Sequence, residues 1–110
     1  MGKYGKAKFD VFGKLVEVPR LETTKSGFEL AKFEIEVITR NPQTKEEKTT
    51  YVPITAMRFD AKAISNTKYV KAGDFFYITG NINTSEYTDK NGNSRLSVEL
   101  VASSILGGSN

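Results

Sequence analysis

Alternation of apolar and polar residues dominates the chain, whereas helical spacing is rare. In residues 9–18 the positions of one parity are Phe9, Val11, Gly13 and Leu15, which predicts a strand with one buried face. Gly13 lies inside this predicted strand and indicates a bend or a close approach by another backbone.

The second predicted strand, residues 28–38, changes parity near its start. Phe28 and Leu30 share one parity, and the other parity contains Ala31, Phe33, Ile35 and Val37. Such a switch requires one extra residue, so it predicts a β-bulge near Leu30 and Ala31. Residues 39–49 are polar and predict a long hairpin loop.

Residues 50–59 form the third predicted strand. We assign to its core face Val52, Ile54 and Ala56, and to its opposite face Tyr51, Pro53, Thr55, Met57 and Phe59. Pro53 conflicts with this assignment, because proline cannot donate a hydrogen bond to a sheet and prefers edges or bulges. Residues 60–69 then predict a short helix with Asp60 as its N-cap.

Two more strands complete the pattern. Residues 70–83 begin with a turn at Ala72-Gly73 and continue as a strand. Residues 95–101 alternate, with the inward positions predicted to be Leu96, Val98 and Leu100. Between these strands residues 88–94, with Asn91-Gly92 at their middle, predict a hairpin tip. Bent strands in this order predict an all-β fold, namely a five-stranded OB-fold Greek-key barrel with one short helix between strands 3 and 4 and an extended hairpin.

Length and composition exclude several classes of protein. A chain of 110 residues predicts one domain, which we place at residues 1–106, with 107–110 as a flexible C-terminal tail. The chain has no cysteine, and therefore no disulfide and no thiolate metal site. It also has no histidine, the usual general base and the commonest transition-metal ligand. We therefore expect no enzymatic activity, no metal and no cofactor.

Charge and hydropathy limit the cellular locations and the kinds of partner that the sequence allows. The net charge of +3, from 16 basic and 13 acidic residues, permits a nucleic-acid partner without requiring one. No apolar run approaches the length of a membrane span, and the basic start MGKYGKAKFD lacks the apolar core of a signal peptide. We expect a soluble intracellular protein without a membrane partner.

Aromatic residues occupy strand faces where polar residues are expected. Tyr51 and Phe59 lie opposite the core positions of the third strand, and Phe75 and Tyr77 lie outward on the fourth. A partner subunit, the helix or a ligand must cover such a face. Bases of single-stranded nucleic acid stack on such rings regardless of sequence, because every base has a π-face.

Basic residues are interleaved with these rings. They are Lys8, Lys14, Lys32, Lys48, Arg58, Lys90 and Arg95. Together with the aromatic residues they predict an electrostatic track with stacking platforms. Most rings pack in a core, to which we assign Phe9, Phe12, Phe28, Phe33 and Phe76. Tyr51 and Tyr87 are better candidates for stacking, because they lie outward beside loops.

These segments, from about Ala7 to Leu106, resemble the single-stranded DNA-binding protein (SSB) family of bacteria and phages. FGKL at 12–15 is similar to its first strand, YVKAGDFFYITGNI at 69–82 to the segment after its helix, and EYTDKNGNSR at 86–95 to its hairpin. The resemblance implies an OB-fold that binds single-stranded DNA without sequence preference in replication, recombination and repair. It implies a homo-oligomer, with a tetramer favoured over a dimer, and a cytoplasmic, nucleoid-associated location in a bacterial cell or a phage-infected host.

The resemblance also assigns roles to individual residues. The stacking aromatics of the family correspond to Tyr51 and Tyr87, and a third corresponds to Met57 or Phe59, of which we favour Phe59. Tyrosine replaces the family's tryptophans, and Ile38 stands at a further stacking position, so we expect a lower affinity per nucleotide. The chain ends without the acidic, phenylalanine-capped tip common in the family, so we expect no recruitment of replication enzymes through such a tip.

Two other functions compete with DNA binding. The aromatic face is also consistent with an OB-fold replisome or primosome accessory that acts mainly through protein contacts. A small nuclease is the third hypothesis, and the absence of a carboxylate cluster in the sequence argues against it.

Overall fold

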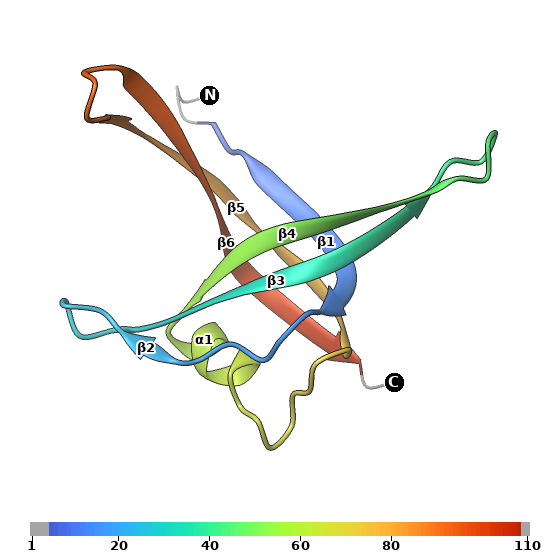
Figure 1. Cartoon of the computed structure of the whole chain (residues 1–110). Helices are drawn as coiled ribbons and strands as arrows, with labels where there is room; N and C mark the ends of the chain where they lie inside the picture. The colour runs from blue at the N-terminus through green and yellow to red at the C-terminus, as the bar shows by residue number, and fades with distance from the viewer. Residues whose placement is uncertain (1–4, 109–110) are drawn as a thin grey trace.

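The computed structural model describes residues 5–108, which form strands around one helix. The elements are β1 (Lys8–Leu15), β2 (Glu22–Thr23), β3 (Glu29–Arg40), β4 (Glu47–Met57), α1 (Phe59–Ile64), β5 (Phe75–Thr88) and β6 (Ser94–Gly108) (Figure 1). The sheet order is β1-β5-β6-β4-β3-β2. An additional pairing of β1 with β3 closes five of these strands into a ring. The predicted all-β barrel with a helix before its last two long strands is therefore confirmed, whereas the short β2 was not predicted.

Residues from every strand of the ring meet in one core. The largest fully buried side chains are Leu15, Ile35, Ile54, Ile64 and Ile78. The predicted inward parities of the first three strands are correct, and Phe9, Val11 and Val52 pack against this core. Gly13 lies where β1 crosses β3, and a Cβ atom there would be 2.3 Å from the carbonyl oxygen of Glu36. The close approach predicted at Gly13 is confirmed, since a larger residue would push the two strands apart.

The β-bulge predicted near Leu30 and Ala31 is wrong. Pairing of β3 with β4 runs without interruption from Leu30 opposite Met57 to Arg40 opposite Glu47. Phe28 lies before β3 and is not part of the strand. Its parity therefore does not bear on the strand, and no extra residue is needed. The irregularity lies instead between β5 and β6, where Thr79 pairs with Ser104 and Gly80 pairs with Ala102.

The structure also corrects the boundaries around the third and fourth predicted elements. β3 and β4 extend into the predicted 39–49 loop, because their cross-strand pairing continues to Arg40 and Glu47. Phe59 is the first residue of α1 and does not lie on the strand. Asp60 lies in the first turn, and the residue at the N-cap position is Arg58, so the predicted N-cap is wrong.

Pro53 keeps its predicted place on β4, opposite Glu34 of β3. Within the described residues β4 pairs with β6 only at Thr55, opposite Val101. Pro53 therefore lies beside an open strand edge, where the missing N–H group breaks no second ladder.

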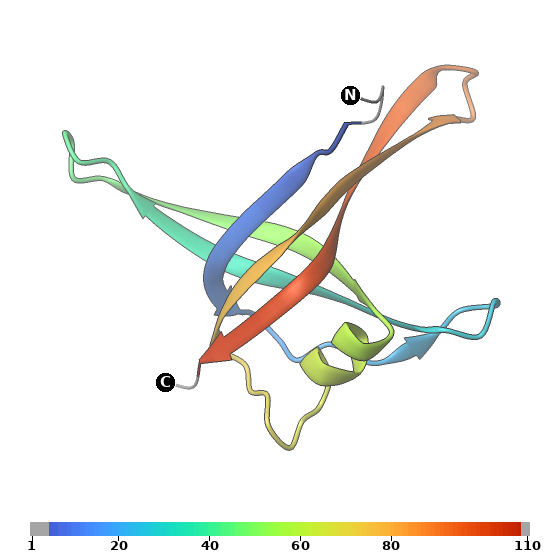
Figure 2. The same ribbon diagram turned by 180° about the vertical axis from the view of Figure 1, so that it is seen from behind.

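The hairpin of β5 and β6 extends beyond the barrel, as Figures 1 and 2 show. Leu96 and Val98 were predicted to point inward, but 62% and 59% of their surface is exposed. They share a face of β6 with Leu100, which packs against the core. The predicted parity is therefore right, but the prediction of burial is wrong because no second layer covers this end of the hairpin.

Three further assignments change at the edges of the barrel. Phe12 was assigned to the core but is exposed, because its parity is opposite to that of Leu15. Phe28 is only half-buried and lies outside the buried cluster. β6 continues to Gly108, and Gly107 pairs with Phe76, so the first half of the predicted 107–110 tail belongs to the sheet. The rest of that predicted tail lies outside the described residues.

Candidate nucleic-acid interface

The two predicted stacking rings lie on different long hairpins. Tyr51 lies on β4 in the hairpin with β3, and Tyr87 lies on β5 in the hairpin with β6. The two hairpins leave the barrel in different directions (Figure 1). The exposed fractions of the two tyrosines are 53% and 54%. Both rings are thus accessible, but a single strand must cross the barrel surface to reach both.

Tyr51 lies in a row of side chains that crosses three strands. Lys14 of β1 pairs with Glu36 of β3, which pairs with Tyr51 of β4. The Tyr51 hydroxyl donates a hydrogen bond to Oε2 of Glu36 at 3.5 Å. Lys14, Glu36 and Tyr51 also line a hollow of about 340 Å³. The ring is therefore held against the barrel wall, with a lysine in the same hollow.

Tyr87 lies directly opposite Arg95 near the tip of the β5–β6 hairpin. The Arg95 Nε donates to Oδ2 of Asp89 at 2.8 Å. Oδ1 of Asp89 accepts the backbone N–H groups of Asn91 and Asn93, each at 2.9 Å. The hydrogen bond from Arg95 has the largest effect on the pKa of Asp89 and holds it below its ordinary value; the two backbone amides lower it further. Asp89 thus orders the tip beside Tyr87 and offsets part of the charge of Arg95.

A glycine completes this turn. Gly92 has a φ of 81°, a left-handed conformation that glycine adopts without steric cost. Its N–H donates to the Asp89 carbonyl at 3.0 Å. The hairpin tip predicted at residues 88–94 is confirmed, since β5 ends at Thr88 and β6 begins at Ser94, and Lys90 is exposed within it.

The predicted basic residues do not form one continuous track. Lys14 lies near Tyr51, and Lys90 lies near Tyr87 on the other hairpin. Lys8 lies on β1 opposite Asn81 of β5, six positions before Tyr87 on that strand. Lys48 lies near the start of β4, where it lines a hollow with Arg40, Glu46 and Glu47.

Lys32 lies in a largely acidic groove. This groove, of about 420 Å³, is lined by Lys32 together with Glu17, Glu34 and Glu99. Carboxylates repel phosphate groups, so the structure separates Lys32 electrostatically from the other predicted cations.

Phe59 and Arg58 lie where β4 ends and α1 begins. Phe59 is 88% exposed, the largest exposed fraction of any large apolar side chain in the described residues. The Arg58 guanidinium lies 5.6 Å from the centroid of the Phe28 ring. Arg58 has a φ of 56° and a ψ of −120°, which is unfavourable for a residue with a side chain.

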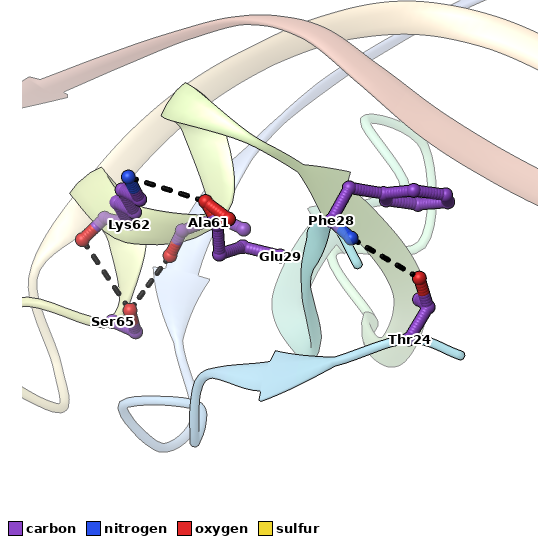
Figure 3. A network of polar contacts seen from close by, with 6 residues as sticks. All are labelled: Thr24, Phe28, Glu29, Ala61, Lys62 and Ser65. Atoms are coloured by element: carbon purple, nitrogen blue, oxygen red, sulfur yellow. Dashed lines mark hydrogen bonds and ion pairs between the residues drawn. The ribbon is translucent and has the colours of Figure 1, made fainter. Parts of the chain in front are cut away.

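Polar contacts fasten α1 to the start of β3, as Figure 3 shows. Lys62 Nζ lies 3.1 Å from Oε1 of Glu29. The hydroxyl of Ser65 donates to the carbonyl oxygen of Ala61 at 2.7 Å and so closes the helix. On the other side of Glu29, the Phe28 N–H donates to Oγ1 of Thr24 at 3.4 Å. Phe28 and α1 are therefore positioned by the same short segment.

Sequence reasoning missed a stacked aromatic pair on the outer face of β1 and β5. The rings of Phe12 and Phe75 are 5.5 Å apart and inclined by 16°. The Lys14 ammonium lies 5.6 Å from the Phe75 centroid. The parity of Phe12, opposite to that of Leu15, is the signal in the sequence that identifies it as outward.

Tyr77 and Leu106 extend this outer face across β5 and β6. They pair directly, and Tyr77 also pairs with Phe12. The Tyr77 hydroxyl donates to Oδ2 of Asp10 at 2.6 Å, and this bond raises the pKa of the phenol. We call the four apolar members the outer aromatic face: Phe12, Phe75, Tyr77 and Leu106.

Among residues 5–108, no group of acidic, cysteine or histidine side chains is arranged to hold a metal ion. In the same part of the chain, no helix has the length and apolar character needed to cross a membrane.

Comparison with known proteins agrees with the OB-fold. A family model described as the single-strand binding protein family matches residues 7–106. No curated protein matches the chain.

Proposed function

The chain belongs to the single-strand binding protein family, and on that premise we propose that it coats and protects exposed single strands in DNA replication, recombination and repair. Membership implies binding of single-stranded DNA, and the proteins of this family are DNA-binding proteins without enzymatic activity. We place one binding domain at residues 1–106, of which the match covers 7–106. A cytoplasmic, nucleoid-associated location is part of the same proposal.

The accessibility of Tyr51 and Tyr87 carries the mechanistic part of this proposal. Each ring is about half exposed on a regular strand, although a tyrosine gains stability by burial. Stacking of a base on an aromatic ring contributes roughly 1–3 kcal/mol by alanine substitution. We infer that the two rings are stacking platforms for bases of unspecified sequence, with Phe59 as a third.

Phosphate contacts supply the remainder of the affinity. Lys14 serves the Tyr51 platform, and Lys90 with Arg95 serves the Tyr87 platform. Lys8, Lys48 and Arg58 extend the contacts along the barrel, whereas the carboxylates around Lys32 limit its share. Because the platforms lie on separate hairpins, oligonucleotides long enough to cross the barrel should bind more tightly than short ones.

Titration of the protein with labelled oligo-dT of increasing length tests this proposal. We expect affinity to rise with length and to exceed affinity for a duplex of the same length. Binding should weaken as salt rises. A plot of log K against log salt concentration should have a negative slope, the salt slope, of about 0.7 per phosphate contact. A duplex bound as tightly as the single strand, or an affinity that ignores salt, would contradict the proposal.

We propose that a second copy of the chain covers the outer aromatic face. Phe12, Tyr77 and Leu106 are exposed neighbours, and a contiguous apolar patch of this kind usually marks an interface. A tetramer is our first expectation and a dimer the alternative. Light scattering should give a multiple of the 12.2 kDa chain mass, and Leu106→Lys should reduce it. A monomer at micromolar concentration would refute this assembly.

The same face favours the second candidate function, an OB-fold accessory of the replisome or primosome that acts mainly through protein contacts. Such a protein should bind oligo-dT weakly, and substitution of Tyr51 or Tyr87 should leave that weak binding unchanged. The oligo-dT titration therefore separates the two functions.

A further inference from the structure

We propose that Phe28 and Arg58 form a phosphate-binding position at the end of β4, in which Arg58 binds the DNA backbone and Phe28 is the positioning residue. This inference rests on the proposed function. It adds a contact with the bound DNA that lies outside the tips of the two hairpins.

The backbone of Arg58 is the first observation. Its φ of 56° and ψ of −120° lie in a region that residues with a Cβ atom rarely adopt. Glycine adopts positive φ without this cost, so glycine would suit folding better at this position. Strained residues persist where the surrounding structure holds them, and they cluster at ligand-binding sites.

The surrounding structure holds Arg58 from both sides. Its N–H donates to the carbonyl oxygen of Glu29 at 2.9 Å, and its carbonyl oxygen accepts the N–H of Lys62 at 3.0 Å. The backbone at the junction of β4 and α1 is therefore fixed, and the direction in which the Arg58 side chain leaves it is fixed as well.

The contact with Phe28 is the second observation. The guanidinium lies 5.6 Å from the ring centroid, which is within the range of a cation–π interaction. An exposed pair of this kind stabilises a fold by less than such backbone strain typically costs. Stability alone therefore does not account for an arginine here.

The arrangement suits a phosphate. The guanidinium is planar and carries N–H groups in a fork whose geometry matches phosphate oxygens. Its Cζ lies over the Phe28 ring, 5.6 Å from the centroid. Arg58 is exposed, and the Glu29 carboxylate beside it is paired with Lys62 at 3.1 Å. Phe59, the next residue, is exposed and places a stacking surface beside the cation. A nucleotide can therefore contact both, with its phosphate on Arg58 and its base on Phe59.

Arg58→Gly separates function from folding. We expect its thermal midpoint to rise, because relief of strain exceeds the smaller entropic effect of glycine on the unfolded chain. We expect its affinity for oligo-dT to fall several-fold and its salt slope to decrease by about 0.7, as for one lost phosphate contact. Arg58→Lys retains a cation and should keep most of the slope.

Phe28→Leu tests the positioning role. It should weaken oligo-dT binding in the wild-type background and have no further effect in the Arg58→Gly background. Additive effects in this double-mutant cycle would show that Phe28 acts independently of Arg58 and would overturn its role. Lys68→Ala is the matched control, because Lys68 lies 5.5 Å from the Tyr69 ring in another exposed cation–π pair. It should leave the salt slope unchanged.

The outcomes distinguish this inference from the proposed function. If the wild-type chain binds oligo-dT and Arg58→Gly binds with the same affinity and slope, this inference alone is overturned. It is also overturned if Arg58→Gly is less stable than the wild type. A wild-type chain that does not bind oligo-dT overturns the proposed function and this inference together.

Discussion

Tyr51 and Tyr87 are equally exposed, but their supports differ. Tyr51 stands on the closed barrel, tethered to Glu36 and next to Lys14. Tyr87 stands on a two-stranded hairpin beyond the barrel, where Asp89 orders the tip and also engages Arg95. A two-stranded hairpin is marginally stable by itself, whereas a barrel strand is held by the core. Equal exposure therefore does not mean equal preorganisation, and binding depends on both.

Replacement of Tyr51 should have the largest effect. We expect Tyr51→Ala to weaken oligo-dT binding by about 2 kcal/mol, because it removes a base platform that needs no ordering on binding. Tyr51→Phe removes the hydrogen bond to Glu36 but keeps the ring, so its affinity should stay near that of the wild type. Fluorescence anisotropy gives the affinities, and circular dichroism checks the fold. A loss in Tyr51→Phe equal to that in Tyr51→Ala would assign the effect to the hydroxyl instead of stacking.

Replacement of Tyr87 should have a smaller effect. Tyr87→Ala should cost about 1 kcal/mol of binding, because part of the stacking energy is spent in ordering the hairpin. Tyr87→Trp, with a larger stacking surface, should bind more tightly than the wild type in the same titration. If Tyr87→Ala lost more affinity than Tyr51→Ala, the claim that the barrel preorganises Tyr51 better than the hairpin preorganises Tyr87 would be wrong.

Replacement of Lys14, near Tyr51, and of Lys32, far from it, should change the salt slope of DNA binding by different amounts. Lys14→Ala should lower the salt slope by about 0.7, because Lys14 shares the hollow of Tyr51. Lys32→Ala should lower it less, because Lys32 lies among carboxylates that already repel phosphate. Equal slopes for the two variants would mean that these local carboxylates do not decide which lysine meets DNA.

Acid should loosen the tip of the β5–β6 hairpin. Arg95 lowers the pKa of Asp89 in the folded hairpin, so the contribution of Asp89 to hairpin order is complete above its ordinary value of 3.8. That contribution is lost as the pH falls through the lower folded-state value. Amide exchange at Asn91 and Asn93, whose N–H groups bind Asp89, should accelerate over this range. Asp89→Asn should abolish the transition, and an unchanged transition in that variant would assign it to another group.

The two hairpins also show which structural features can be predicted from residue patterns. The turn at Asn91-Gly92 was predictable, because local chemistry alone favours that turn. The stacking role of Tyr51 and Tyr87 followed from their outward parity and remains a prediction. Phe12 also has outward parity, but its ring was assigned to the core.

The strain at Arg58 was not predictable from the sequence. The N–H of Arg58 donates to the carbonyl oxygen of Glu29, which lies far from it along the chain, while the bond from Lys62 is the first turn of α1. The pairing of Arg58 with Phe28 likewise depends on how the start of β3 meets the end of β4. Local propensity contains no information about either contact.

By itself the sequence determined the strand faces, the hairpin turn and the barrel class, because alternation and turn chemistry act between near neighbours. Tertiary structure alone decided where each face is covered. Leu96 and Val98 have the parity of core residues yet remain exposed, because the barrel ends before the hairpin does. A period of two specifies the side of a sheet on which a residue lies, but only the packing of distant strands places a second layer against that side.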